Sequence, residues 1–145
     1  MTTLAPKPTI AYDTNTFRSE NLIPFLIKNQ AIFHIAIPAI VYAERGYSFL
    51  LNGESFQTFD EEIMAYNGEV LPLTRVQIAN AVNLAHSHRN TLPFRDHSRD
   101  YLIAGQCQGT INIFISYNVK HFQALALDPT RIMTPEEFFL EFAPA

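Results

Sequence analysis

Three acidic residues stand in apolar surroundings at widely separated points of this sequence. Asp13 follows one apolar run, Glu44 interrupts another, and Asp100 opens a third. A buried carboxylate is costly unless a cation accompanies it, and we assign no lysine or arginine of the sequence to this role. Hard divalent cations such as Mg²⁺ and Mn²⁺ prefer oxygen ligands of this kind. We therefore expect the three acids to bind a metal and to support metal-assisted phosphodiester chemistry.

Each of these acids also has a purely structural interpretation. Asp13 suits the cap of a following helix, and Asp100 suits a first helical turn, where the helix dipole favours negative charge. Glu44 could be a solvated helix residue paired with Arg45. The three acids nevertheless fall at the entry and exit points of successive strand and helix units. This shared placement favours a common site.

The composition is that of a folded domain. The chain has 145 residues, of which 48% are hydrophobic, so we expect one domain over residues 1–145. A net charge of −4 argues against a strongly basic nucleic-acid-binding domain. Cys107 is the only cysteine, which excludes an internal disulfide and fits a reducing compartment. With no secretory signal and no apolar run of membrane-spanning length, we expect a cytoplasmic protein.

One local stretch, residues 86–99, is basic against this acidic background. It is either a solvated loop and helix end or a strip that faces phosphate groups beside Asp100. Its basic residues and histidines, against Asp96 as the only acid, are His86, His88, Arg89, Arg95, His97 and Arg99.

Strand and helix patterns alternate along the chain, which predicts a three-layer α/β/α domain around a mainly parallel sheet. The expected core spans residues 9–133. The expected strands are 9–12, 32–37, 69–73, 111–116 and 131–133. The expected helices are 16–28, 38–51, 55–66, one after Thr74, one from about His97, 119–125 and 135–142.

Particular residues support these elements. Pro38 suits a first helical turn, where its missing N–H matters least, and Thr134 with Glu137 forms a capping box before the last helix. The helix after Thr74 carries a broad apolar face. Functional groups of parallel α/β sheets collect at the carboxyl ends of the strands. Asp13 and Ser116 are both placed at such ends.

Four segments together resemble the PIN-domain family, specifically the VapC-like toxin ribonucleases of type II toxin–antitoxin systems. They are IAYDTN at 10–15, PAIVYAER at 38–45, DYLIAGQC at 100–107 and SYNVKHF at 116–122. The resemblance spans residues 9–133. It implies a Rossmann-like α/β/α fold and an endoribonuclease that depends on Mg²⁺ or Mn²⁺. It also implies a homodimer inhibited by a cognate antitoxin protein.

The resemblance also implies roles for single residues. Asp13, Glu44 and Asp100 would be the catalytic metal ligands. The fourth acidic position of many PIN nucleases falls at Asn118, a neutral ligand, and Asp96 is the alternative fourth ligand.

Further residues would support these ligands or contact the substrate. Ser116 stands where threonine is frequent and would orient a water or an acid, with Asn15 as a second supporting residue. Arg95, Arg99 and Lys120 are the expected contacts to RNA phosphates. The RNA would be single-stranded or looped, so that its bases are accessible.

Two other functions are considered. The segment at 13–16 resembles the nucleophilic loop of haloacid-dehalogenase-like phosphatases, but Asn15 stands where that family has a second aspartate. Alternatively, the chain is an interaction module with a PIN fold, which would leave the carboxyl groups scattered over different surfaces. None of the five histidines and Cys107 has the spacing of a zinc site.

Overall fold

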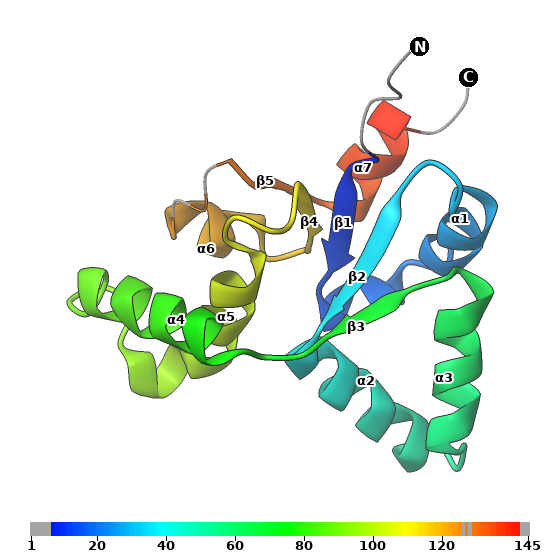
Figure 1. Cartoon of the computed structure of the whole chain (residues 1–145), viewed down its shortest axis with the longest axis horizontal. Helices are drawn as coiled ribbons and strands as arrows, with labels where there is room; N and C mark the ends of the chain where they lie inside the picture. The colour runs from blue at the N-terminus through cyan, green and yellow to red at the C-terminus, as the bar shows by residue number, and fades with distance from the viewer. Residues whose placement is uncertain (1–6, 126, 128, 143–145) are drawn as a thin grey trace.

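A five-stranded parallel sheet forms the centre of the molecule (Figure 1). The computed structural model describes residues 7–125, 127 and 129–142. Strand order across the sheet is β3-β2-β1-β4-β5, and every neighbouring pair is parallel. The strands are β1 (Thr9–Tyr12), β2 (His34–Pro38), β3 (Glu69–Leu71), β4 (Ile113–Ile115) and β5 (Arg131–Met133).

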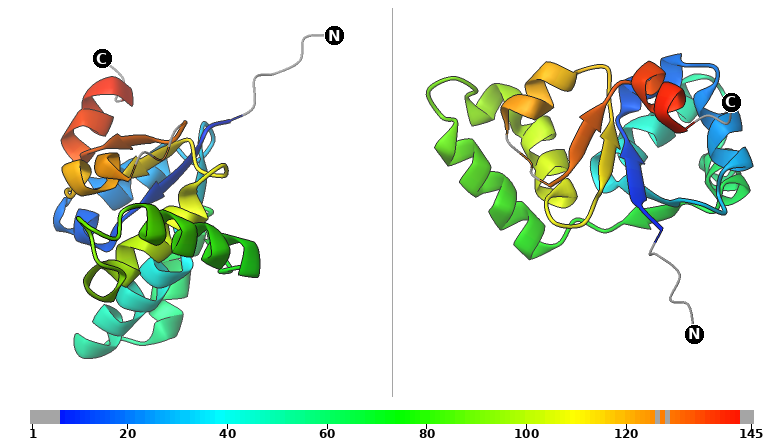
Figure 2. Two further views of the ribbon diagram at one scale, coloured as in Figure 1. Left: turned by 90° about the vertical axis from the view of Figure 1, so that its left-hand side faces the viewer. Right: turned by 90° about the horizontal axis from the view of Figure 1, so that it is seen from above.

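Helices lie on both sides of this sheet (Figure 2), which confirms the predicted three-layer α/β/α architecture. Among the described residues, no helix is both long enough and apolar enough to cross a membrane. The helices are η1 (Thr14–Arg18, a 3-10 helix), α1 (Leu22–Lys28), α2 (Ala39–Leu51), α3 (Phe56–Ala65), α4 (Arg75–Ser87), α5 (Phe94–Cys107), α6 (Val119–Ala124) and α7 (Pro135–Phe142).

The two central strands explain why the acids could be recognised in the sequence. All residues of β4 are buried, and so are Ile10, Ala11 and Tyr12 of β1. Strands of parallel sheets are covered on both faces and therefore read as continuous apolar runs. A polar residue that follows such a run marks the end of the strand.

Strand register sets the position of the site. Tyr12 pairs with Ile115, and the backbone N–H of Asp13 donates to the carbonyl oxygen of Ile115 over 2.8 Å. Asp13 and Ser116 therefore leave the sheet side by side at its carboxyl edge. Helix α2 begins at Ala39, one residue later than predicted, because Pro38 is the last residue of the neighbouring strand and the N-cap of the helix (φ −58°, ψ 146°).

The predicted helix over 16–28 is wrong, because the structure has two shorter helices in its place. The Asp13 carboxylate accepts from the backbone N–H of Thr14 and caps η1, which ends at Ser19 in extended backbone (φ −79°, ψ 115°). A new helix, α1, begins at Leu22. Three predicted strands were also too long, since β2 begins at His34, β3 ends at Leu71, and β4 covers only Ile113–Ile115 of the expected 111–116.

Helix α5 begins earlier than predicted and is kinked. It starts at Phe94 after Pro93, so Asp96 lies in its first turn. The expected start, His97, instead has non-helical backbone angles (φ −126°, ψ 16°) inside the helix. The kink changes the direction of the first turn of α5 relative to the rest of the helix.

Helices α4 and α5 pack closely, but the predicted apolar face of α4 is only partly buried. Ala81 and Ala85 are buried, whereas Val76 and Val82 are 70% and 51% exposed. A Cβ atom at Gly105 of α5 would collide with the backbone of α4 at Gln77 and Ala81. Glycine at this position therefore permits the close helix contact.

The C-terminal helix α7 begins as predicted. The backbone N–H of Glu137 donates to Thr134 Oγ1, and the backbone N–H of Thr134 donates to Glu137 Oε1. This reciprocal pair is the capping box that the sequence indicated. Phe138 of α7 is fully buried against Phe25 of α1, with ring centroids 5.1 Å apart.

Candidate active site

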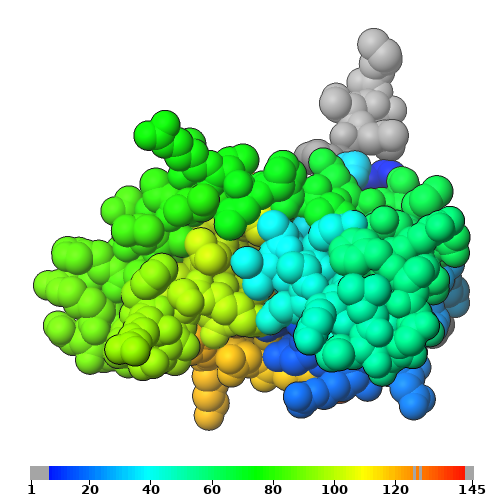
Figure 3. Space-filling view, turned by 90° about the horizontal axis from the view of Figure 1, so that it is seen from below, coloured from blue at the N-terminus to red at the C-terminus, as the bar shows by residue number. Residues whose placement is uncertain are grey.

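A cleft of about 660 Å³ opens at the carboxyl edge of the sheet. Its lining comes from η1 and the Asp13 cap, from α2, from the first half of α5 and from Asn118 before α6. Figure 3 looks onto the face where these segments meet, with α2 in cyan beside α5 in yellow-green and the blue chain after β1 below them. Segments that are distant in the sequence thus line one cleft.

Asp13 is the most buried member of the site, at 1% exposure. Its Oδ1 accepts from the backbone N–H of Thr14 at 2.7 Å and from Arg99 Nη2 at 2.5 Å. Its Oδ2 accepts from Ser116 Oγ at 3.0 Å. Asp13 therefore caps η1, as its structural interpretation predicted, and also takes part in an ion pair with Arg99.

Glu44 reaches the same point from α2. Its Oε1 accepts from Thr14 Oγ1 at 2.5 Å and from Arg99 Nη2 at 2.8 Å, and its Oε2 accepts from Arg99 Nε at 2.6 Å. Burial by itself raises the pKa of Glu44, but the hydrogen bonds from Arg99 and Thr14 outweigh it and lower the pKa below the ordinary value. The carboxylate form is thereby favoured.

Arg99 is the centre of the cluster, because Asp100 also binds it, with Nη1 to Oδ1 at 2.6 Å. Burial lowers the pKa of Arg99, but Glu44 and Asp13 raise it by more, so the guanidinium stays charged. The prediction that no basic residue neutralises the acids is therefore wrong. Arg99, which the sequence analysis assigned to RNA phosphates, contacts all three carboxylates.

The guanidinium marks where a cation is favourable, but the present geometry is that of an ion-pair network. One positive charge faces three carboxylates, which leaves a formal excess of negative charge around Arg99. The three carboxylates do not bring their oxygens within 4.8 Å of one another, since the single such group among the described residues is a different one. The donor set suits a hard divalent ion, provided that Arg99 moves away and the acids close in.

The predicted supporting residues lie around this centre. Ser116 orients Asp13 and also accepts from the backbone N–H of Asn118 at 3.0 Å. Asn15 Oδ1 accepts from the backbone N–H of Tyr117 at 3.2 Å, which holds two loops together. Asn118 and Asp96 both line the cleft, Asp96 being exposed at its rim.

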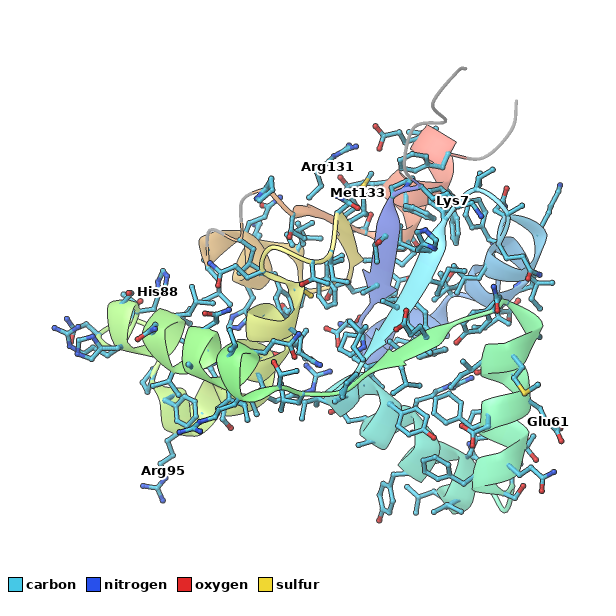
Figure 4. All side chains as sticks on the ribbon, in the orientation of Figure 1. Lys7, Glu61, His88, Arg95, Arg131 and Met133 are labelled. Carbon is cyan, nitrogen blue, oxygen red and sulfur yellow. The ribbon has the colours of Figure 1, made fainter. Side chains whose placement is uncertain are left out.

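Two of the three predicted phosphate contacts do not line the cleft. Arg95 and Lys120 are exposed and are not among the lining residues, and Figure 4 shows Arg95 projecting away from the ribbon. Two unpredicted arginines, Arg18 and Arg45, do line it. Arg45 lies over the ring of Phe17 at 3.8 Å, a cation–π contact that no sequence spacing indicated.

A second group of residues adjoins the acids. His121 from α6 places Nε2 3.0 Å from Asp100 Oδ2, and its ring stacks on His97 with centroids 5.1 Å apart. No spacing in the sequence connects these two histidines, because they lie on different helices and far apart along the chain.

The convergence of the carboxylates bears on the alternative functions. An interaction module was expected to leave its carboxyl groups on different surfaces, whereas Asp13, Glu44 and Asp100 all bind one guanidinium. For a phosphatase of the haloacid dehalogenase type, Asn15 would need to act as an acid. Its side chain instead binds the backbone of Tyr117.

Comparison with known proteins identifies the fold. No protein-family model matches the chain, and no curated protein matches it by sequence. Among solved structures, the fold is that of PIN-like α/β/α proteins. One similar structure is a chain of VapBC2 from Rickettsia felis, crystallised with a DNA fragment from its promoter. The TM-score is 0.63 with 18% identity, and the match covers 86% of this chain and 96% of the other.

Proposed function

We propose that this protein is a metal-dependent endoribonuclease of the VapC-like PIN class and acts as the toxin of a toxin–antitoxin pair. The observation that carries the proposal is the meeting of Asp13, Glu44 and Asp100 on one cation in an open cleft. The PIN-like fold supports the same class. The reaction is hydrolysis of RNA phosphodiester bonds.

Asp13, Glu44 and Asp100 would hold Mg²⁺ or Mn²⁺, with Asn118 or Asp96 as the fourth ligand. The ion supplies an activated water and stabilises negative charge on the scissile phosphate. The chain positions the ligands through neutral hydroxyl groups, since Ser116 donates to Asp13 and Thr14 donates to Glu44. Arg99, once released from the acids, lies at the right place to bind the RNA phosphate that enters the cleft.

The proposed partners are single-stranded RNA, a cognate antitoxin protein and a second copy of this chain, in the cytoplasm. The similar VapBC2 structure is solved as a complex with DNA from its promoter, which supports an antitoxin partner. Apolar side chains exposed near the end of α2 are available for protein contacts: Tyr47, Leu50 and Leu51 are 62%, 52% and 68% exposed.

Cleavage of a single-stranded RNA with Mg²⁺ or Mn²⁺ tests the proposal. Asp13→Asn and Asp100→Asn each remove a ligand charge while keeping the side-chain shape, so we expect cleavage to fall by at least about 100-fold. The matched control is Glu61→Gln, because Glu61 is an exposed acid of α3 that points away from the site (Figure 4). Thermal melting establishes that each variant is folded.

Equal cleavage by the wild-type chain and by both ligand variants would remove the assigned roles. Asp100→Asn is the more informative variant, because Asp13 also caps η1 and its loss affects local structure. Retained cleavage by Asp100→Asn with full loss in Glu61→Gln would contradict the proposal equally.

A further inference from the structure

A group of nitrogen and oxygen ligands lies beside the acid cluster. His97, Asp100 and His121 each offer one ligand atom, and these atoms lie within 4.8 Å of one another. His97 lies at the kink of α5 and Asp100 lies three residues after it, while His121 is the third residue of α6. The three residues therefore converge from two separate helices.

The contact between His121 and Asp100 is not that of an ordinary hydrogen bond. Nε2 of His121 is buried and has no hydrogen-bond partner within the part of the chain that the structure describes, although Asp100 Oδ2 lies only 3.0 Å from it. The nitrogen and the oxygen are thus close but poorly directed for an N–H donor. Two ligand atoms of one tetrahedral ion, each at about 2.1 Å, lie about 3.4 Å apart, so the present separation is within a few tenths of an ångström of that geometry.

Local structure holds the ligands in place. The His97 and His121 rings stack with an interplanar angle of 29°, and His121 also meets Phe122 edge-on. The side chains of His121 and Asp100 are only 14% and 16% exposed. Because His97 has non-helical backbone angles, the kink places its ring against His121 instead of along the regular face of α5.

Asp100 divides its two oxygens between the two groups. Oδ1 binds Arg99 in the acid cluster, and Oδ2 faces His121. A single carboxylate can therefore serve two neighbouring cations, as in two-metal sites whose ions are about 3.5–4 Å apart.

We propose that His97, Asp100 and His121 form a second metal site that takes a borderline divalent transition ion such as Zn²⁺, Co²⁺ or Mn²⁺. Two imidazoles with one carboxylate are typical ligands of such ions, whereas Mg²⁺ prefers oxygen. Three protein ligands leave further coordination positions open to water or to a phosphate oxygen. This site goes beyond the proposed nuclease, whose ion is held by oxygens alone, and does not depend on nuclease activity.

Metal titration of the untagged chain after removal of bound metal by a chelator tests the proposal. We expect one Zn²⁺ per chain by calorimetry, and Co²⁺ to give the visible absorption of an imidazole-ligated ion. His121→Gln and His97→Gln should each weaken Zn²⁺ binding by about 100-fold, since each removes one of three ligands. The control is His88→Gln, a change at the far end of α4 (Figure 4).

Glu44→Gln separates this site from the proposed nuclease. It removes a ligand of the acid cluster but none of the second site, so Zn²⁺ binding should remain within about threefold of the wild-type value while Mg²⁺-dependent cleavage falls. Absence of stoichiometric Zn²⁺ and Co²⁺ binding would overturn the second site, and so would binding that both histidine variants retain. Even if the second site is overturned in this way, loss of cleavage in Glu44→Gln would still support the proposed nuclease.

Discussion

Arg99→Met is the most informative single change, because it removes the cation from the acid cluster while keeping a side chain of similar length. Asp13 would lose its contact with Nη2 and remain as a buried charge. Removing one partner of a buried ion pair costs about 3–5 kcal/mol. The cost here is smaller, because Arg99 and Glu44 are each 36% exposed and solvent screens them.

We therefore expect Arg99→Met to lower the free energy of unfolding of the metal-free chain by about 2–3 kcal/mol. For a chain of this size the melting temperature would fall by roughly 5–10 °C. Differential scanning calorimetry in a chelating buffer measures this loss. Arg131→Met is the matched control, since Arg131 pairs with Glu141 on the surface, where such pairs contribute about 0–1 kcal/mol.

Added Mg²⁺ should reverse the loss. In the variant the ion meets free carboxylates, whereas in the wild-type chain it must first displace the guanidinium. At a free concentration of about 100 times Kd, a bound ligand stabilises the folded state by about 2.7 kcal/mol, which matches the expected loss. If the variant is as stable as the wild-type chain without metal, and Mg²⁺ stabilises both equally, Arg99 does not neutralise the acids and the reasoning fails.

Two further predictions concern the residues that support the site. Ser116→Ala removes the hydroxyl group that binds both Asp13 Oδ2 and the backbone N–H of Asn118. We expect RNA cleavage to fall about tenfold, and the free energy of unfolding in urea denaturation to fall by about 1 kcal/mol. Unchanged cleavage would show that Asp13 needs no such support. Gly105→Ala places a Cβ against the backbone of Gln77. We expect the free energy of unfolding, measured by urea denaturation, to fall by about 1–3 kcal/mol. Equal stability would show that α4 and α5 can separate at little cost.

The strands of this fold could be predicted from the sequence because a parallel sheet covered on both faces imposes a simple pattern. Ile113–Ile115 is apolar throughout and buried throughout, and Asp13 stands out because it directly follows such a run. Boundaries were less predictable where a local hydrogen bond decides them. The backbone N–H of Ser19 bonds the carbonyl oxygen of Thr16 and ends η1 in extended backbone, which divides the expected long helix, and no apolar periodicity records that bond.

The partners of the acids could not be predicted from spacing. Adjacent residues on a regular helix point about 100° apart, so Arg99 and Asp100 were not expected to serve one cluster. The long side chain of Arg99 nevertheless bends back to its neighbour and reaches Asp13 and Glu44 on other elements. The same limit applies to His97 and His121, which only the packing of α6 against the kink in α5 brings together.

The charge of the cleft gives the acid cluster and the substrate a common physical requirement. RNA is a polyanion and the chain carries a net charge of −4, so association needs local positive charge at the site. With Arg99 bound to three carboxylates, the centre of the site is formally negative and its guanidinium is occupied. In the proposed function, a divalent ion in place of the guanidinium would neutralise the acids and also release Arg99 for a phosphate. Metal binding and RNA binding would then be coupled through one side chain, because each would need Arg99 to leave the acids.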